Sequence, residues 1–130
     1  MTTNISDIKV LIIDDEVEFA TTLAARLKLR EYSTQLATSG EEGLISLENN
    51  PPDVVVLDLK MPNLDGLEVL AQIKEINPTI ETIILTGHGS FEAGEEGMQL
   101  GAFDYLMKPV DLNLLLEKIK EAYEKRSQTI

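Results

Sequence analysis

The run Val-Val-Val-Leu at residues 54–57 is followed directly by Asp58. Short apolar runs rich in β-branched residues are typical of strands that are buried on both faces, as they are in parallel sheets. The run therefore predicts a central strand that delivers a carboxylate at its carboxyl end. Four other segments are further strand candidates, the last two of them weaker: residues 10–13, 82–86, 33–37 and 102–106.

Segments with helical spacing separate these runs. Apolar residues recur every three or four positions in residues 17–27, 67–76 and 112–123. Four residues are candidate helix N-caps, the first two in capping boxes with Glu42 and Glu68: Ser39, Asp65, Ser90 and Asp111. The order strand–helix, repeated five times, predicts an α/β fold whose parallel sheet carries helices on both faces.

Residues 91–101 form the helix with the weakest signal. Gly94 and Gly97 each cost about 1 kcal/mol relative to alanine in a helix interior. Both share one predicted face with Phe91 and Met98, so we expect that face to pack closely against the sheet.

Composition limits the possible functions. The chain of 130 residues fits one domain, and 43% hydrophobic with 26% charged residues is typical of a globular protein. Its net charge of −12 argues against direct binding to nucleic acid or to an anionic membrane. With no Cys and one His, the sequence offers no disulfide, thiolate zinc site or multi-histidine metal site.

No signal peptide is apparent at the start of the sequence, and every apolar run is far shorter than the ~20 residues of a membrane helix. We therefore expect a cytoplasmic protein.

Polar and charged side chains follow most of the predicted strands. In an open parallel sheet these positions share one edge, where ligands bind. The residues there are Asp14, Asp15, Glu16, Asp58, Thr86 and Lys108. Carboxylates ~5 Å apart repel by about 3 kcal/mol per pair at an effective dielectric of ~20, so a cation must offset them. Lys108 is one candidate, and Mg²⁺, which prefers oxygen ligands, is the other.

A purely structural interpretation is also open. Asp14 and Asp15 can cap the first helix, and Asp58 can simply end a strand. A nucleotide or flavin site is disfavoured, because no glycine-rich loop follows the first strand.

Four sequence pieces together resemble the receiver domains of two-component response regulators, which are CheY-like. They are Val-Leu-Ile-Ile-Asp-Asp-Glu at 10–16, Val-Val-Val-Leu-Asp-Leu-Lys-Met-Pro-Asn-Leu-Asp-Gly at 54–66, Ile-Ile-Leu-Thr-Gly at 83–87 and Gly-Ala-Phe-Asp-Tyr-Leu-Met-Lys-Pro at 101–109. The resemblance extends from about Lys9 to Tyr123. It implies a flavodoxin-like, doubly wound five-stranded parallel sheet in the order 2-1-3-4-5. The whole chain, 1–130, would be a single receiver domain with its core at about 7–126.

The resemblance also implies roles for individual residues. Asp58 would be the phosphoacceptor, whose carboxylate attacks phosphorus. Lys108 and Thr86 would contact the phosphoryl group, and Thr86 and Tyr105 would form the switch pair. The Mg²⁺ ligands would be Asp14, Asp15, Asp58 and the backbone carbonyl of Lys60. In such domains the proline at the position of Pro109 is often in the cis form.

The implied partners are a sensor histidine kinase and an output domain or target protein, and phosphorylation could drive homodimer formation. The domain would be a switch that assists its own phosphorylation and dephosphorylation and is not a turnover enzyme. Two alternatives stay open: an interaction scaffold that is never phosphorylated, and an aspartate-nucleophile phosphohydrolase. Lys60 disfavours the phosphohydrolase, because that class usually carries a second acid two residues after its nucleophile.

Overall fold

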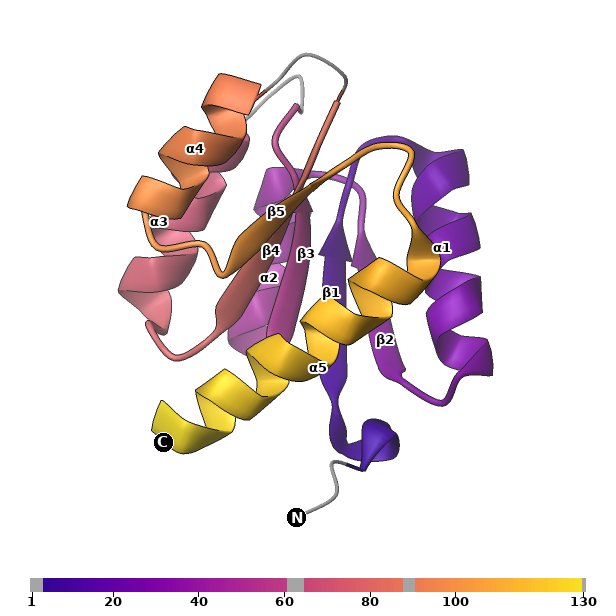
Figure 1. The fold of residues 1–130 in the computed structure, drawn as a ribbon. Helices are drawn as coiled ribbons and strands as arrows, with labels where there is room; N and C mark the ends of the chain where they lie inside the picture. The colour runs from indigo at the N-terminus through magenta and orange to yellow at the C-terminus, as the bar shows by residue number, and fades with distance from the viewer. Residues whose placement is uncertain (1–3, 61–64, 88–90, 130) are drawn as a thin grey trace.

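The computed structural model describes residues 4–60, 65–87 and 91–129. Within these ranges a five-stranded parallel sheet has the order β2-β1-β3-β4-β5, which confirms the predicted architecture (Figure 1). The strands are β1 (Lys9–Ile13), β2 (Ser33–Ala37), β3 (Val54–Asp58), β4 (Glu81–Thr86) and β5 (Asp104–Met107).

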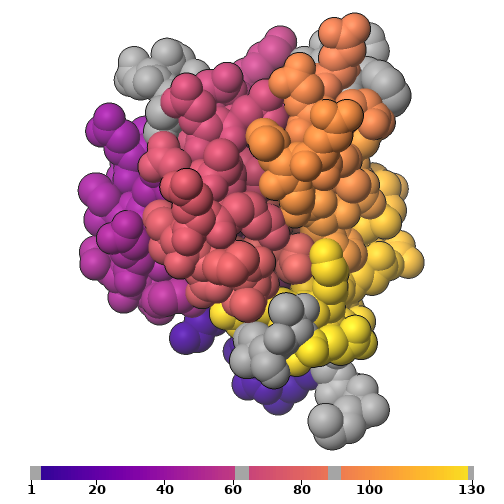
Figure 2. All heavy atoms as spheres, turned by 90° about the vertical axis from the view of Figure 1, so that its left-hand side faces the viewer, coloured from indigo at the N-terminus to yellow at the C-terminus, as the bar shows by residue number. Residues whose placement is uncertain are grey.

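Helices cover both faces of the sheet. After the short 3₁₀ helix Ile5–Asp7, they are α1 (Val17–Leu29), α2 (Gly40–Asn49), α3 (Gly66–Ile76), α4 (Phe91–Gln99) and α5 (Leu112–Thr129). Helices α1 and α5 lie on one face, and α2, α3 and α4 lie side by side on the other (Figures 1 and 2). None of the helices in the described ranges is long and apolar enough to span a membrane.

Two apolar clusters fill the space between the sheet and its helices. On one face Val10, Val54 and Ile83 pack with Leu23 of α1 and Ile119 of α5. On the other, alternate residues of the same strands pack against α2 and α3. Because successive side chains of a strand point to opposite faces, an uninterrupted apolar run supplies both clusters. This explains why β1, β3 and β4 are recognisable in the sequence.

Helix starts follow the predicted caps where the structure describes them. Ser39 Oγ accepts the backbone N–H of Glu42 at 3.1 Å, and Asp65 Oδ1 accepts that of Leu67 at 3.0 Å. Asp111 Oδ1 accepts the N–H of Asn113 at 2.9 Å. The predicted cap Ser90 lies outside the described residues, as do Met61 and Pro62 of the second motif.

The two glycines of α4 allow it to approach the sheet closely. A Cβ at Gly94 would lie 2.6 Å from the Tyr105 ring, and one at Gly97 would lie 2.1 Å from Cδ1 of Ile84. The predicted inward position of both glycines is therefore confirmed. The Phe91 side chain, which shared that predicted face, is not described.

Gly66 fixes the start of α3 against the chain that follows β3. A Cβ at this position would lie 2.5 Å from Cα and 2.8 Å from the carbonyl oxygen of Leu59, and the Gly66 N–H donates to that oxygen at 3.2 Å. Because the obstacle is backbone, it cannot move aside as a side chain can. The glycine thus secures the segment that follows Asp58.

We predict that Gly66→Ala lowers the free energy of unfolding by about 1–3 kcal/mol, the usual cost of overpacking. Urea denaturation measures the change. The matched control is Gly87→Ala, since among the described residues a Cβ there would meet no atom within 4 Å. Equal losses in the two variants would contradict the steric explanation.

Candidate functional site

Asp58 is the last residue of β3 and is only 4% exposed. Its Oδ1 accepts the backbone N–H of Lys60 at 3.2 Å. Burial, and next the charge of nearby Asp14, raise the pKa of the Asp58 carboxyl to about 6. The structure thus places a carboxylate that is costly to ionise at the centre of the edge where sequence predicted the site.

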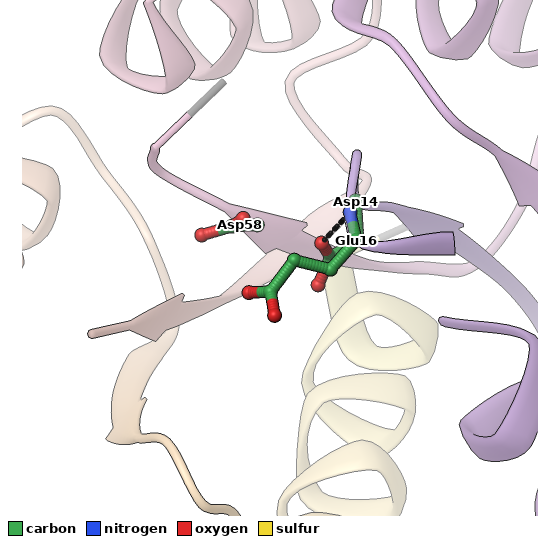
Figure 3. Close-up of side chains that lie close together, drawn as sticks. All are labelled: Asp14, Glu16 and Asp58. Atoms are coloured by element: carbon green, nitrogen blue, oxygen red, sulfur yellow. Dashed lines mark hydrogen bonds between the residues drawn. The ribbon is translucent and has the colours of Figure 1, made fainter. Parts of the chain in front are cut away.

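Asp14 follows β1 and is almost fully buried. Its backbone N–H donates to the carbonyl of Ala37 at 3.1 Å, which fixes it beside the end of β2. Its Oδ1 accepts the backbone N–H of Glu16 at 2.9 Å, the dashed line in Figure 3. The structural interpretation, in which Asp14 or Asp15 caps the first helix, is wrong, because the N-cap of α1 is Glu16 and no side chain makes a cap hydrogen bond there. Asp14 orders the chain just before α1, and its other carboxylate oxygen is directed at Lys108.

Lys108 brings positive charge to these acids. Its Nζ lies 2.6 Å from Glu16 Oε1, 3.0 Å from Asp14 Oδ2 and 3.6 Å from Asp58 Oδ2. Burial alone would lower the pKa of Lys108, but its hydrogen bonds to Glu16 and Asp14 raise that pKa above the usual value. The ammonium also lies 4.4 Å from the centre of the Phe19 ring. The peptide bond from Lys108 to Pro109 is cis.

The carboxylates of Asp14, Glu16 and Asp58 form a cluster (Figure 3). One oxygen from each lies within 4.8 Å of the others. Three carboxylates facing a single ammonium leave the site with net negative charge. An all-oxygen donor set of this kind fits a hard divalent cation such as Mg²⁺.

Two of the predicted metal ligands are not part of this cluster. Asp15 is half-buried, and its carboxylate lies outside the group of clustered oxygens. Lys60 is exposed, and the contribution of its backbone carbonyl stays a prediction. The roles of Asp15 and Lys60 in metal binding are therefore still expectations from the resemblance.

The predicted switch residues lie on β4, which pairs with β3, and on β5, which pairs with β4. Thr86, at the end of β4, is 1% exposed, and its Oγ1 donates to Met107 Sδ at 3.1 Å. Tyr105 on β5 is half-buried, and its hydroxyl donates to Glu95 Oε1 of α4 at 3.2 Å. Both side chains thus connect the edge of the sheet to neighbouring elements.

Sequence reasoning did not assign a role to three residues of the site. Glu16 is the third acid of the run at 14–16, and this position is the sequence feature that could have identified it as part of the site. Phe19 lies one helical turn further along, against Lys108. Met107 has no sequence signal of its own beyond its position before Lys108.

Comparison with known proteins assigns the family. The family model described as "Response regulator receiver domain" matches residues 10–120. The chain belongs to this family. Its four motifs and its fold are therefore those of a receiver domain.

Several known proteins are similar to this receiver domain. Over 122 residues, 94% of the chain, it is 36% identical to the transcriptional regulatory protein ZraR of Salmonella typhimurium. Over 120 residues, 92% of the chain, it is 37% identical to the response regulator MprA of a Mycobacterium species. A crystal structure of a receiver domain protein from Clostridium thermocellum has 39% sequence identity and a TM-score of 0.89, covering 95% of this chain and 99% of that one.

The chain spans only part of the curated relatives. It covers 28% of the length of ZraR and 52% of the length of MprA. In both relatives the matched region is thus accompanied by further sequence.

The raised pKa of Asp58 predicts a pH-dependent effect of Asp58→Asn on stability in metal-free buffer. At about pH 8 the buried charge opposes folding, so the variant should be more stable by on the order of 2 kcal/mol. As the pH falls through about 6, native Asp58 takes up a proton before the unfolded chain does, near its ordinary value of 3.8. The difference should then shrink and vanish below about pH 4.

Urea unfolding of both proteins between about pH 4 and pH 8 measures this difference. The control is Asp7→Asn, because the Asp7 side chain is exposed. If the stability difference between Asp58→Asn and the wild type did not change with pH, the raised pKa of the buried Asp58 carboxyl could not be its cause.

Proposed function

We propose that the chain is a phosphorylation-dependent signalling switch whose phosphoacceptor is Asp58. The observation that carries the proposal is the environment of this carboxylate in a receiver domain. It is buried at the end of β3, 3.6 Å from the ammonium of Lys108, and clustered with Asp14 and Glu16. Such an arrangement suits a carboxylate that becomes phosphorylated, because the acyl phosphate carries more negative charge than the carboxylate that it replaces.

In the reaction we propose, a carboxylate oxygen of Asp58 attacks the phosphorus of a phosphohistidine on a sensor kinase. The new O–P bond gives an acyl phosphate, and the P–N bond to the histidine breaks. Lys108 compensates charge on the transferring group, which is the main task in phosphoryl transfer. Its ammonium already lies between Glu16 and Asp58, so a short movement would bring it to the phosphoryl oxygens.

We propose Mg²⁺ as the cofactor, with Asp14, Asp15, Asp58 and the Lys60 carbonyl as its ligands. When bound, the ion would neutralise charge on the phosphoryl group. The net negative charge of the carboxylate cluster supports a cation at this place. Asp15 is not part of that cluster, so its role as a ligand rests on the resemblance to receiver domains.

A cavity lies beside Thr86, and Asp58 is not among the described residues that line it. Its volume is about 370 Å³, and its lining includes Lys60, Thr86 and Gly87. Among the described residues Gly87 leaves open space where a larger residue would place its Cβ. The open space at Gly87 supports ready access to the acceptor carboxylate.

The output of the switch would be a change at the face formed by Thr86, Tyr105 and α4. Thr86 would hydrogen-bond the phosphoryl group and Tyr105 would turn inward, which shifts the population toward an active state. We propose that an output domain or a separate target protein responds to this change. Relatives such as ZraR, in which the matched region is a minor part of the length, support this.

Incubation of the chain with Mg²⁺ and acetyl phosphate tests the proposal, with intact mass as the readout. We expect uptake of one phosphoryl group, which Asp58→Asn abolishes and chelation of the metal strongly reduces. The exposed Asp7→Asn serves as the matched control and should be modified like the wild type. Uptake that persists in Asp58→Asn would refute the assignment of the acceptor, and no uptake in the wild type would favour the unphosphorylated scaffold.

A further inference from the structure

Thr86 and Met107 are direct neighbours across the β4–β5 pair. They are register partners in the parallel ladder, as are Ile84 and Tyr105 two residues earlier. The N–H of Lys108 donates to the carbonyl of Thr86 at 2.8 Å, so the end of β5 is fixed against Thr86. Side chains of paired residues point to the same face, and this places the thioether beside the hydroxyl.

The Thr86 hydroxyl has a hydrogen-bond requirement that Met107 meets. Thr86 is 1% exposed, and its Oγ1 donates to Met107 Sδ at 3.1 Å. A buried hydroxyl without an acceptor is costly, so this contact gives the hydroxyl a preferred orientation. A thioether sulfur is, however, only a weak acceptor.

Packing does not account for the position of Met107. Its side chain is 40% exposed, and within the described part of the chain it belongs to neither of the two apolar clusters. The contact with Thr86 is therefore the interaction that distinguishes methionine here from another apolar residue of similar size.

We propose that Met107 is a positioning residue that holds the Thr86 hydroxyl in the unphosphorylated state. This inference rests on the proposed function, in which Thr86 moves to a phosphoryl oxygen. A hydrogen bond to an ionised oxygen is stronger than one to sulfur, so the hydroxyl changes partner when the phosphoryl group arrives. The weak acceptor defines the resting orientation and yet opposes the change only slightly.

A double-mutant cycle tests the proposal in the full chain with Mg²⁺. Its members are the wild type, Met107→Leu, Thr86→Val and the double variant, and its readout is the affinity for beryllofluoride, a phosphoryl mimic. Met107→Leu keeps the bulk and removes the acceptor, so it should bind beryllofluoride at least about threefold more tightly. The same substitution in the Thr86→Val background should change nothing.

Met107→Gln provides the opposite change, because its side-chain carbonyl is a stronger acceptor than sulfur. We expect it to bind beryllofluoride more weakly than the wild type. Equal effects of Met107→Leu with and without the Thr86 hydroxyl would overturn the proposal, as would no effect in either background.

The same four proteins unfolded by urea without ligand separate this inference from the proposed function. Met107→Leu should lower the unfolding midpoint more when the Thr86 hydroxyl is present, and additive losses would overturn the contact. If the wild type failed to bind beryllofluoride, the proposed function would fall and with it the role of Met107 in switching. If the wild type binds it but the cycle is additive, only the inference about Met107 falls.

Discussion

The ammonium of Lys108 lies among the carboxylates of Asp14, Glu16 and Asp58. The arrangement of these acids at the carboxyl ends of the strands depends on its positive charge. Two unit charges 4 Å apart interact by about 4 kcal/mol at an effective dielectric of 20, so three unbalanced carboxylates could not all be ionised there. The acids come from the ends of β1 and β3 and the lysine from the end of β5. The ammonium thus joins distant parts of the chain, while leaving enough negative charge to attract a cation.

The lysine of the charge site and the switch residue Tyr105 are connected through β5. β5 is followed directly by Lys108, which reaches the carboxylates, while Met107 and Tyr105 on the same strand contact Thr86 and α4. A movement of Lys108 toward a new anion would therefore also displace its neighbours on β5, Met107 and Tyr105. The glycines of α4, which bring the helix against Tyr105 and Ile84, make the same face sensitive to a change of the tyrosine side chain.

The sequence predicted the fold well because apolar runs buried on both faces have few alternatives to a parallel sheet. It also predicted that Asp14, Asp58, Thr86 and Lys108 share an edge, since chain topology alone determines this. The directions of the side chains could not be predicted from the sequence. The presence of Glu16 and the absence of Asp15 in the cluster depend on how the loop after β1 turns and on the reach of Lys108. Likewise, the pairing of Thr86 with Met107 follows from the register of β4 and β5, and the pairing of Tyr105 with Glu95 follows from the placement of α4.

A crystal structure of the chain with Mg²⁺ and beryllofluoride tests the central claim most directly. We predict beryllium bonded to a carboxylate oxygen of Asp58, with the Lys108 ammonium moved from Glu16 to a fluoride. The ion should be ligated by the neighbouring acids. Beryllofluoride bonded to another residue, or an Asp58 that stays unmodified while Lys108 remains paired with Glu16, would contradict the claim.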